Sequence, residues 1–190
     1  GKRSIYEGGH RTPFLVRWPA KVKPKASSDQ IICGSDLFAT VADVIGKADA
    51  IPVTAAEDSF SFLPALLGKD EGKTLRPSTI HHSINGSFAI RKGKWKLCLC
   101  PGSGGWSAPR PNVALKNKSL PLVQLFDLES DPAEKNNLQG KHPKIVKELV
   151  ADLAQAIHDG RTNKGPKQAN DGHPNTFHAK ILASYPVLNP

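Results

Sequence analysis

The sequence predicts an α/β chain whose first part alternates apolar and helical segments and whose second part is an antiparallel sheet. Between residues 13 and 46, a short apolar run is followed by apolar residues at helical spacing. From residue 78 onward, apolar residues recur with a period of two, as in strands that bury one face. A last apolar stripe at helical spacing, between residues 145 and 157, predicts a helix that covers this sheet.

The first two predicted elements are a strand and a helix. Residues 13–19, PFLVRWP, are mostly apolar and bounded by prolines, which is typical of a short strand buried in a larger sheet. Ser35 and Asp36 are suitable N-caps for a helix that ends at Gly46. Its apolar residues would share one face, and they are Leu37, Phe38, Val41, Val44 and Ile45. Residues 47–77 mix polar residues, Pro and Gly, and we expect a connector there.

A hairpin and a third strand form the predicted sheet. Apolar residues alternate on both sides of a turn at Lys92-Gly93, and they are Phe88, Ile90, Trp95, Leu97 and Leu99. Residues 101–121 predict a long loop, and residues 124–128 a further short strand. We expect Trp95 and Leu97 to pack on the last helix, because each apolar stripe needs a cover.

The last predicted helix begins at Pro143 and ends at Gly160. Its apolar stripe comprises Ile145, Val146, Leu149, Leu153, Ala156 and Ile157. After Arg161 the sequence is polar and rich in proline, and we expect an extended tail.

Composition narrows the class of protein. The 190 residues are 38% hydrophobic and 23% charged, which is enough apolar material for a core, while 16 Pro and 16 Gly favour a fold rich in loops. No apolar run reaches the roughly 18–20 residues that cross a bilayer, and the charged opening does not resemble a signal peptide. Because the chain has no methionine, we expect it to be an excerpt of a longer protein.

Three cysteines predict no disulfide framework. Cys98 and Cys100 lie two residues apart on a predicted strand and would point to the same side, which disfavours a bond between them. Cys33 completes an odd count, so at least one thiol has no partner within the chain. The cysteines are compatible with an oxidising or a reducing compartment.

Positive charge is concentrated in two stretches. The formal net charge is +9, while residues 1–25 carry +6 and residues 91–118 carry +7. If the fold brings the two stretches together, their field would attract an anionic ligand. The alternative is two solvated basic faces without a ligand.

Residue chemistry offers few catalytic motifs. The sequence contains no GxSxG, Walker, HExxH or zinc-finger pattern. His81 and His82 are a candidate cluster, but neighbouring strand residues face opposite ways, so one buried and one exposed histidine is the simpler expectation. Asp171, His173 and His178 could ligate a metal, although their polar tail argues against it.

The opening of the sequence resembles a stretch of the arylsulfatases. Residues 1–14 read GKRSIYEGGHRTPF and are followed by VRWP, and the family stretch has the form G-K-x-x-x-Y-E-G-G-x-R-x-P-F. Further blocks follow in the family's order and at about its spacing. They are SDLFAT at 35–40, DSFSFLP at 58–64, HS at 82–83, FAIRKGKWKL at 88–97, LFDL at 125–128, DPAE at 131–134 and NL at 137–138.

This resemblance, which covers residues 1 to about 161, implies the C-terminal part of an alkaline-phosphatase-like sulfatase fold. That α/β fold has a small antiparallel sheet packed on a C-terminal helix. We therefore expect residues 1–70 to end the catalytic α/β domain, 71–161 to form a C-terminal subdomain, and 162–190 to form the tail.

The resemblance also implies a reaction, the hydrolysis of sulfate esters. The family uses a formylglycine nucleophile, made from Cys or Ser in a C/S-x-P-x-R motif beside a calcium ion. That motif is absent, and no Asp-Asp or Asp-Asn pair precedes Lys2, so we expect these parts upstream and this piece inactive by itself. Lys2 stands where the family places a lysine against the sulfate, a role that suits a compact cation.

The charge map favours a substrate with several negative charges, such as a sulfated carbohydrate. We expect His81 or His82 and the loop around Trp106 to select the sugar. Two alternatives stay open, a phosphoesterase or phosphonate hydrolase of the same superfamily and a non-catalytic basic module that binds a polyanion. Nucleic acid is not an expected partner, because the basic runs lack interleaved aromatic residues. The resemblance suggests a secreted, periplasmic or lysosome-like location.

Overall fold

The structure, a computed structural model, describes residues 3–170 and 179–188. The chain divides into two compact units, which are treated separately below. Unit 1 comprises residues 1–12, 80–157 and 170–190, and unit 2 comprises residues 13–79 and 158–169. The domain boundaries predicted at residues 70 and 161 stay predictions.

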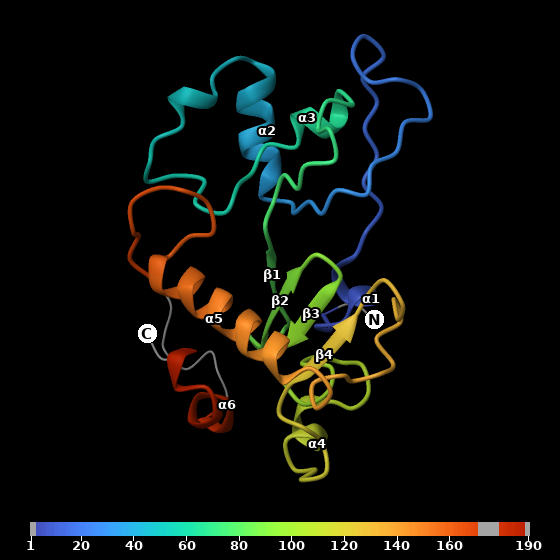
Figure 1. The fold of residues 1–190 in the computed structure, drawn as a ribbon, viewed down its shortest axis with the longest axis vertical. Helices are drawn as coiled ribbons and strands as arrows, with labels where there is room; N and C mark the ends of the chain where they lie inside the picture. The colour runs from blue at the N-terminus through green and yellow to red at the C-terminus, as the bar shows by residue number, and fades with distance from the viewer. Residues whose placement is uncertain (1–2, 171–178, 189–190) are drawn as a thin grey trace. The chain divides into compact units, whose positions relative to one another are not determined.

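Unit 1 is built on a four-stranded sheet in the order β1-β2-β3-β4 (Figure 1). The strands are β1 (Thr79–His82), β2 (Phe88–Lys92), β3 (Trp95–Cys98) and β4 (Gln124–Asp127). Antiparallel pairing places Ile90 opposite Leu97, and Leu97 opposite Leu125. Gly93 has a φ of +57°, which the tight turn between β2 and β3 requires. The predicted hairpin and third strand are confirmed.

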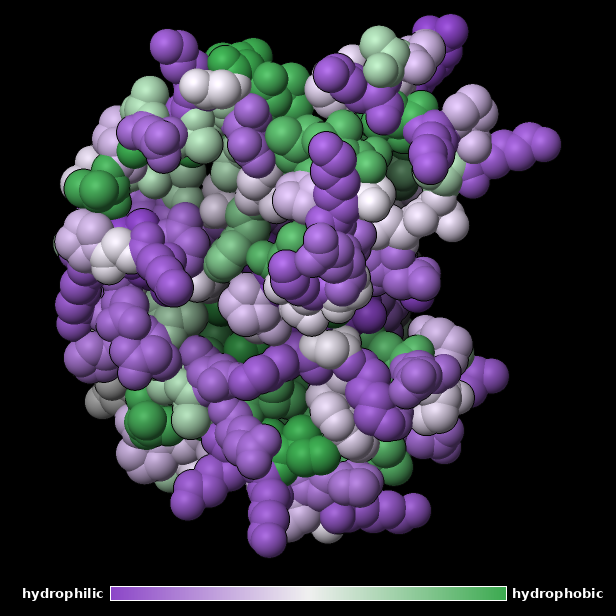
Figure 2. All heavy atoms as spheres, turned by 45° about the horizontal axis from the view of Figure 1, so that its top comes forward, coloured by the Kyte–Doolittle hydropathy of each residue, from purple (hydrophilic) through white to green (hydrophobic). Residues whose placement is uncertain are grey.

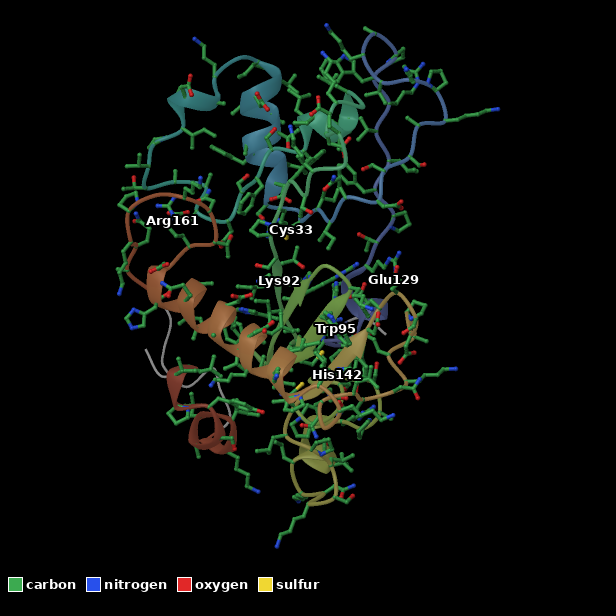
Figure 3. All side chains as sticks on the ribbon, viewed as in Figure 1. Cys33, Lys92, Trp95, Glu129, His142 and Arg161 are labelled. Carbon is green, nitrogen blue, oxygen red and sulfur yellow. The ribbon has the colours of Figure 1, made fainter. Side chains whose placement is uncertain are left out.

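One face of the sheet is covered by α5 (Pro143–Asp159), the predicted helix (Figure 1). Leu97 and Trp95 belong to the same apolar cluster as the buried stripe of α5, so their predicted packing is confirmed. The indole of Trp95 also lies 5.0 Å from the ring of His142, both labelled in Figure 3. The buried members of that stripe are Val146, Leu149, Val150, Leu153 and Ala154.

The other face of the sheet is also covered, which the sequence did not predict. The chain segment at Ile5 and Tyr6, followed by the short helix α1 (Glu7–His10), packs on it. Its apolar cluster includes Ala89, Cys98, Cys100, Phe126 and Leu128. Cys98 and Cys100 are free thiols on this same face, as their spacing predicts.

The end of the chain differs from the expected extended tail. Residues 179–188 form α6 (Ala179–Ser184) and a short 3₁₀ helix (Pro186–Leu188). Ile181 and Leu188 are buried in the same apolar cluster as α5. Burial of apolar side chains on the sheet therefore stabilises helical turns inside a largely polar segment. A further short helix, α4 (Pro111–Ala114), interrupts the long loop after β3.

Unit 2 contains α2 (Asp36–Val44), a 3₁₀ turn (Ala48–Ala50) and α3 (Leu63–Leu66). The predicted helix is confirmed as α2, but Ser35 makes no side-chain cap and donates its hydroxyl to the Asp58 carbonyl instead. Asp36 accepts hydrogen bonds from the Cys33 and Phe60 amides and pairs with the buried Arg76 at 2.9 Å. This buried carboxylate organises the loops around α2.

The strand predicted at residues 13–19 does not form. A strand needs a neighbour for its backbone hydrogen bonds, and the described part of unit 2 offers none. Phe14 and Leu15 are consequently exposed, as is the apolar face predicted for α2, which includes Phe38 and Val41. Figure 2 shows exposed hydrophobic residues among the hydrophilic ones on the face it presents.

No helix among the described residues combines the length and the apolar character needed to span a membrane.

Candidate functional site

The segment that follows Lys2 is fixed within unit 1. Lys2 itself lies outside the described residues, as do Asp171, His173 and His178. The carbonyl of Arg3 accepts a hydrogen bond from the Ile84 amide at 3.1 Å, directly after β1. The Ile5 amide donates to the Ser103 carbonyl at 2.8 Å. The residues that carry Lys2 are therefore attached both to the end of β1 and to the loop after β3.

The loop at residues 101–109 is closed on itself by a buried serine. The Ser103 hydroxyl donates to the Ser107 carbonyl at 2.6 Å and accepts from the Gly105 amide at 3.1 Å. The Ser103 amide donates to the Pro109 carbonyl at 3.2 Å. A loop with its polar groups paired in this way presents its outermost side chain, Trp106, in a defined position.

Two glycines let this loop lie against its neighbours. A Cβ at Gly105 would overlap the carbonyl of Arg3, and a Cβ at Gly104 would lie 2.6 Å from the Ser83 hydroxyl oxygen. Trp106 is 61% exposed, and its ring lies 3.8 Å from the guanidinium carbon of Arg3. Trp106 is thus brought next to the residue that follows Lys2.

Beneath the segment lies a buried cluster of charged side chains. The Lys96 ammonium is fully buried and lies 3.0 Å from Glu7 Oε1, 2.8 Å from Glu134 Oε1 and 3.1 Å from His10 Nε2. Glu134 Oε1 accepts no hydrogen bond, so its contact with Lys96 is an ion pair without hydrogen-bond geometry. Glu134 Oε2 accepts the Glu7 amide hydrogen at 2.5 Å, and Arg91 lies 3.5 Å from Glu7.

The two carboxyl groups of this cluster have pKa values shifted in opposite directions. Burial raises the pKa of Glu7, but the charge and hydrogen bond of Lys96 outweigh it, and the net pKa is lowered. For Glu134 burial dominates over the same lysine, and the pKa is raised. One ammonium thus serves two carboxyl groups, of which Glu7 holds its charge more firmly.

His81 and His82 face opposite sides, as the strand geometry predicts. The ring of His81 stacks on that of His10, with centroids 4.0 Å apart and planes at 16°. Burial, followed by the charges of His10 and Lys96, lowers the pKa of His81 to about 3. His82 is exposed, and its ring lies edge-to-face with that of Phe88, with the ring centroids 4.0 Å apart. His82 is the more exposed of the two histidines.

Sequence reasoning missed Arg3 and the residues around Lys96. Lys96 occupies a polar position in an alternating strand, which ordinarily faces solvent. The signal that could have revealed it is the pair Cys98 and Phe126 on that same face, because apolar residues there require a second cover.

No group of three or more His, Cys, Asp or Glu side chains within residues 3–170 and 179–188 could hold a metal ion. The calcium ion that the resemblance implies does not fit this part of the chain.

A family model described as N-sulphoglucosamine sulphohydrolase, C-terminal, matches residues 1–99. The chain belongs to this sulfatase family. The N-acetylgalactosamine-6-O-sulfatase of Bacteroides thetaiotaomicron is 41% identical over 160 residues, which cover 83% of this chain and 29% of that protein. Human arylsulfatase A is 32% identical over 186 residues, which cover 90% of this chain and 36% of that protein.

Solved sulfatase structures share the fold. One, from work on the metabolism of multiple glycosaminoglycans by Bacteroides thetaiotaomicron, has a TM-score of 0.66 and 39% identity. The match covers 83% of this chain and 31% of the chain in that structure. A second from the same work has a TM-score of 0.52 and 22% identity, over 76% of this chain and 30% of that one, and shows the fold only. The predicted fold class, the C-terminal part of a sulfatase fold, is confirmed. The sulfatase chain spans about a third of the length of the curated relatives it matches.

Proposed function

We propose that this chain is the C-terminal portion of a sulfatase that hydrolyses sulfate esters of carbohydrates, with Lys2 against the sulfate group. In this proposal the formylglycine nucleophile and the calcium ligands lie in the preceding part of the protein. Lys2 stabilises the charge that develops on the sulfate and the leaving oxygen, as a preorganised cation does without reorganising. A secreted, periplasmic or lysosome-like location goes with this family role.

The names of the relatives support a carbohydrate substrate. Besides the N-acetylgalactosamine-6-O-sulfatase, they include an ulvan-active sulfatase of Formosa agariphila and an endo-4-O-sulfatase of Bacteroides thetaiotaomicron. The particular sugar and sulfate position of this protein's substrate are not fixed by those names.

The observation that carries the proposal is the packing of the Trp106 loop against the residues after Lys2. An exposed indole on a braced loop is a suitable surface for a sugar ring, since it offers a large apolar face with a polar edge. The loop also touches Ser83, the residue after His82. We therefore assign sugar contact to Trp106 and the exposed His82, while His81 supports them from behind through its stack on His10.

The test is an assay of the complete protein on sulfated mono- and oligosaccharides and on a singly charged aryl sulfate. Electrostatic steering predicts that kcat/KM rises with substrate charge and that this advantage shrinks as salt screens the field. Lys2→Ala should lower kcat by at least about tenfold, as loss of one charge-stabilising donor does. The chain by itself should show no turnover.

Three results would contradict the proposal. Unchanged kinetics in Lys2→Ala would return that lysine to the solvated surface. A preference for phosphate esters would support the phosphoesterase alternative, and salt-sensitive binding of polyanions without hydrolysis would support a non-catalytic module.

A further inference from the structure

Arg3 is held flat against an exposed aromatic ring. Its guanidinium carbon lies 3.8 Å from the Trp106 ring centroid, and both residues are exposed. Stacking of this kind leaves the N–H groups at the edge of the guanidinium plane free to donate outward. The arrangement therefore fixes the plane of the donors without using them.

The backbone of Arg3 is in a conformation that glycine adopts more easily. Its φ is +73°, in the left-handed region that penalises a side chain. The position is held on both sides, since the Arg3 carbonyl accepts the Ile84 amide hydrogen and packs against Gly105. Glycine would adopt this backbone conformation with less strain. The presence of arginine therefore suggests that its side chain has a function at this position.

The charge of Arg3 is not neutralised within the described part of the chain. Two arginines of the structure have carboxylate partners: Arg76 pairs with Asp36, and Arg91 lies 3.5 Å from Glu7. For Arg3, residues 3–170 and 179–188 supply no such ion pair. A guanidinium that is held in place by stacking and has no carboxylate partner is suited to bind an anion from outside the chain.

We propose that Arg3 and Trp106 form a subsite for a second anionic group, a carboxylate or a further sulfate, on the carbohydrate whose sulfate ester is hydrolysed. This inference rests on the proposed function. A guanidinium donates two parallel hydrogen bonds to a carboxylate or sulfate, and Trp106 limits the freedom lost on binding. Arg3 follows Lys2 directly, so the second anion would lie on the same glycan as the reacting sulfate.

The experiment measures binding to the complete protein by titration calorimetry. Three probes are compared: a monosulfated monosaccharide, a disaccharide that adds a uronic acid carboxylate, and a disaccharide that adds a second sulfate. Arg3→Gln should lower the ratio of disaccharide to monosaccharide affinity by at least about tenfold, as expected for a lost charge-assisted bidentate contact. The disaccharide whose advantage disappears identifies the anion.

Arg110→Gln is the matched control, because Arg110 is also exposed, lies just after the same loop and carries the same charge. It should leave the affinity ratio unchanged. Equal losses in both variants, or an unchanged ratio in Arg3→Gln, would overturn the subsite. Thermal unfolding of each variant shows that the fold is retained.

The outcome separates this subsite from the proposed function. A protein that binds these disaccharides through Arg3 but hydrolyses no sulfate ester contradicts the function and supports the subsite. A protein that hydrolyses sulfated sugars with an Arg3-independent affinity ratio supports the function and contradicts the subsite.

Discussion

The Lys96 ammonium lies 3.0 Å from Glu7 Oε1, although 89 positions separate these residues in the chain. Both side chains are buried, and the pair joins the segment after Lys2 to the centre of β3. A buried ion pair adds little stability over apolar residues, but the loss of one partner leaves a charge without compensation. The pair therefore fixes where the segment sits.

Lys96→Met should strongly destabilise unit 1, by about 3–5 kcal/mol, because Glu7 and Glu134 would lose their shared cation. Urea titration followed by hydrogen exchange of the β2 and β3 amides measures the change. Lys94→Met is the control, two residues away with a partly exposed ion pair to Asp127, and its effect should be much smaller. Equal effects of the two substitutions would contradict the role of the buried cluster.

The stability of unit 1 should fall in mild acid. A histidine in an unfolded chain binds a proton near pH 6.5, while the pKa of His81 in the folded chain is about 3. The contribution of His81 is therefore complete above pH 6.5 and is lost as the pH falls toward 3, with a slope of up to ~1.4 kcal/mol per pH unit. Hydrogen exchange at pH 7, 6 and 5 measures it, and His81→Phe should reduce the slope.

The two tryptophans of unit 1 should respond differently to truncation. Trp95 packs against the apolar cluster on α5, so Trp95→Ala should lower the free energy of unfolding by about 3–5 kcal/mol. Trp106 is 61% exposed, and Trp106→Ala should change stability little while it weakens the binding of sulfated sugars. A solvent-exposed fluorescence signature for Trp95, measured in a variant without the other tryptophans, would contradict the first expectation.

Gly105→Ala should impair the site without a general loss of the fold. The added methyl group would meet the carbonyl of Arg3, so the Trp106 loop must move away from the segment that carries Lys2. We expect kcat/KM of the complete protein on a sulfated sugar to fall at least about tenfold, since small displacements of a site are costly. Gly140→Ala is the matched control, because a Cβ there meets no atom within 4 Å.

The sequence was sufficient for the elements whose patterns are complete within a few residues. Alternation around Gly93 predicts the hairpin, and the stripe of α5 matches the apolar face that Trp95 and Leu97 present. The prediction of a strand at residues 13–19 was wrong. A strand forms only where a neighbouring strand accepts and donates its backbone hydrogen bonds, and a local sequence pattern does not reveal that neighbour. The helix α6 was missed because the polar segment before it obscured its few apolar residues.

The site was harder to predict than the fold. Lys96 has the alternation of a solvent-facing residue, and its burial depends on a segment that lies far away in the sequence. Arg3 has no motif of its own, and its stacking on Trp106 depends on the path of a loop that starts almost a hundred residues later. Interactions of this range have no signature in a window of neighbouring residues.

The long separation between Glu7 and its partners also sets an order of events during synthesis. Residues 3–10 leave the ribosome well before Lys96. Glu134, whose carboxylate accepts a hydrogen bond from the Glu7 amide, follows Glu7 by 127 positions. Until those residues emerge, the segment with Lys2 has no sheet to settle on, and closure of so long a loop is a slow step. Glu7 is thus among the first residues of unit 1 to be made, while the side chains that hold it on the sheet are made much later.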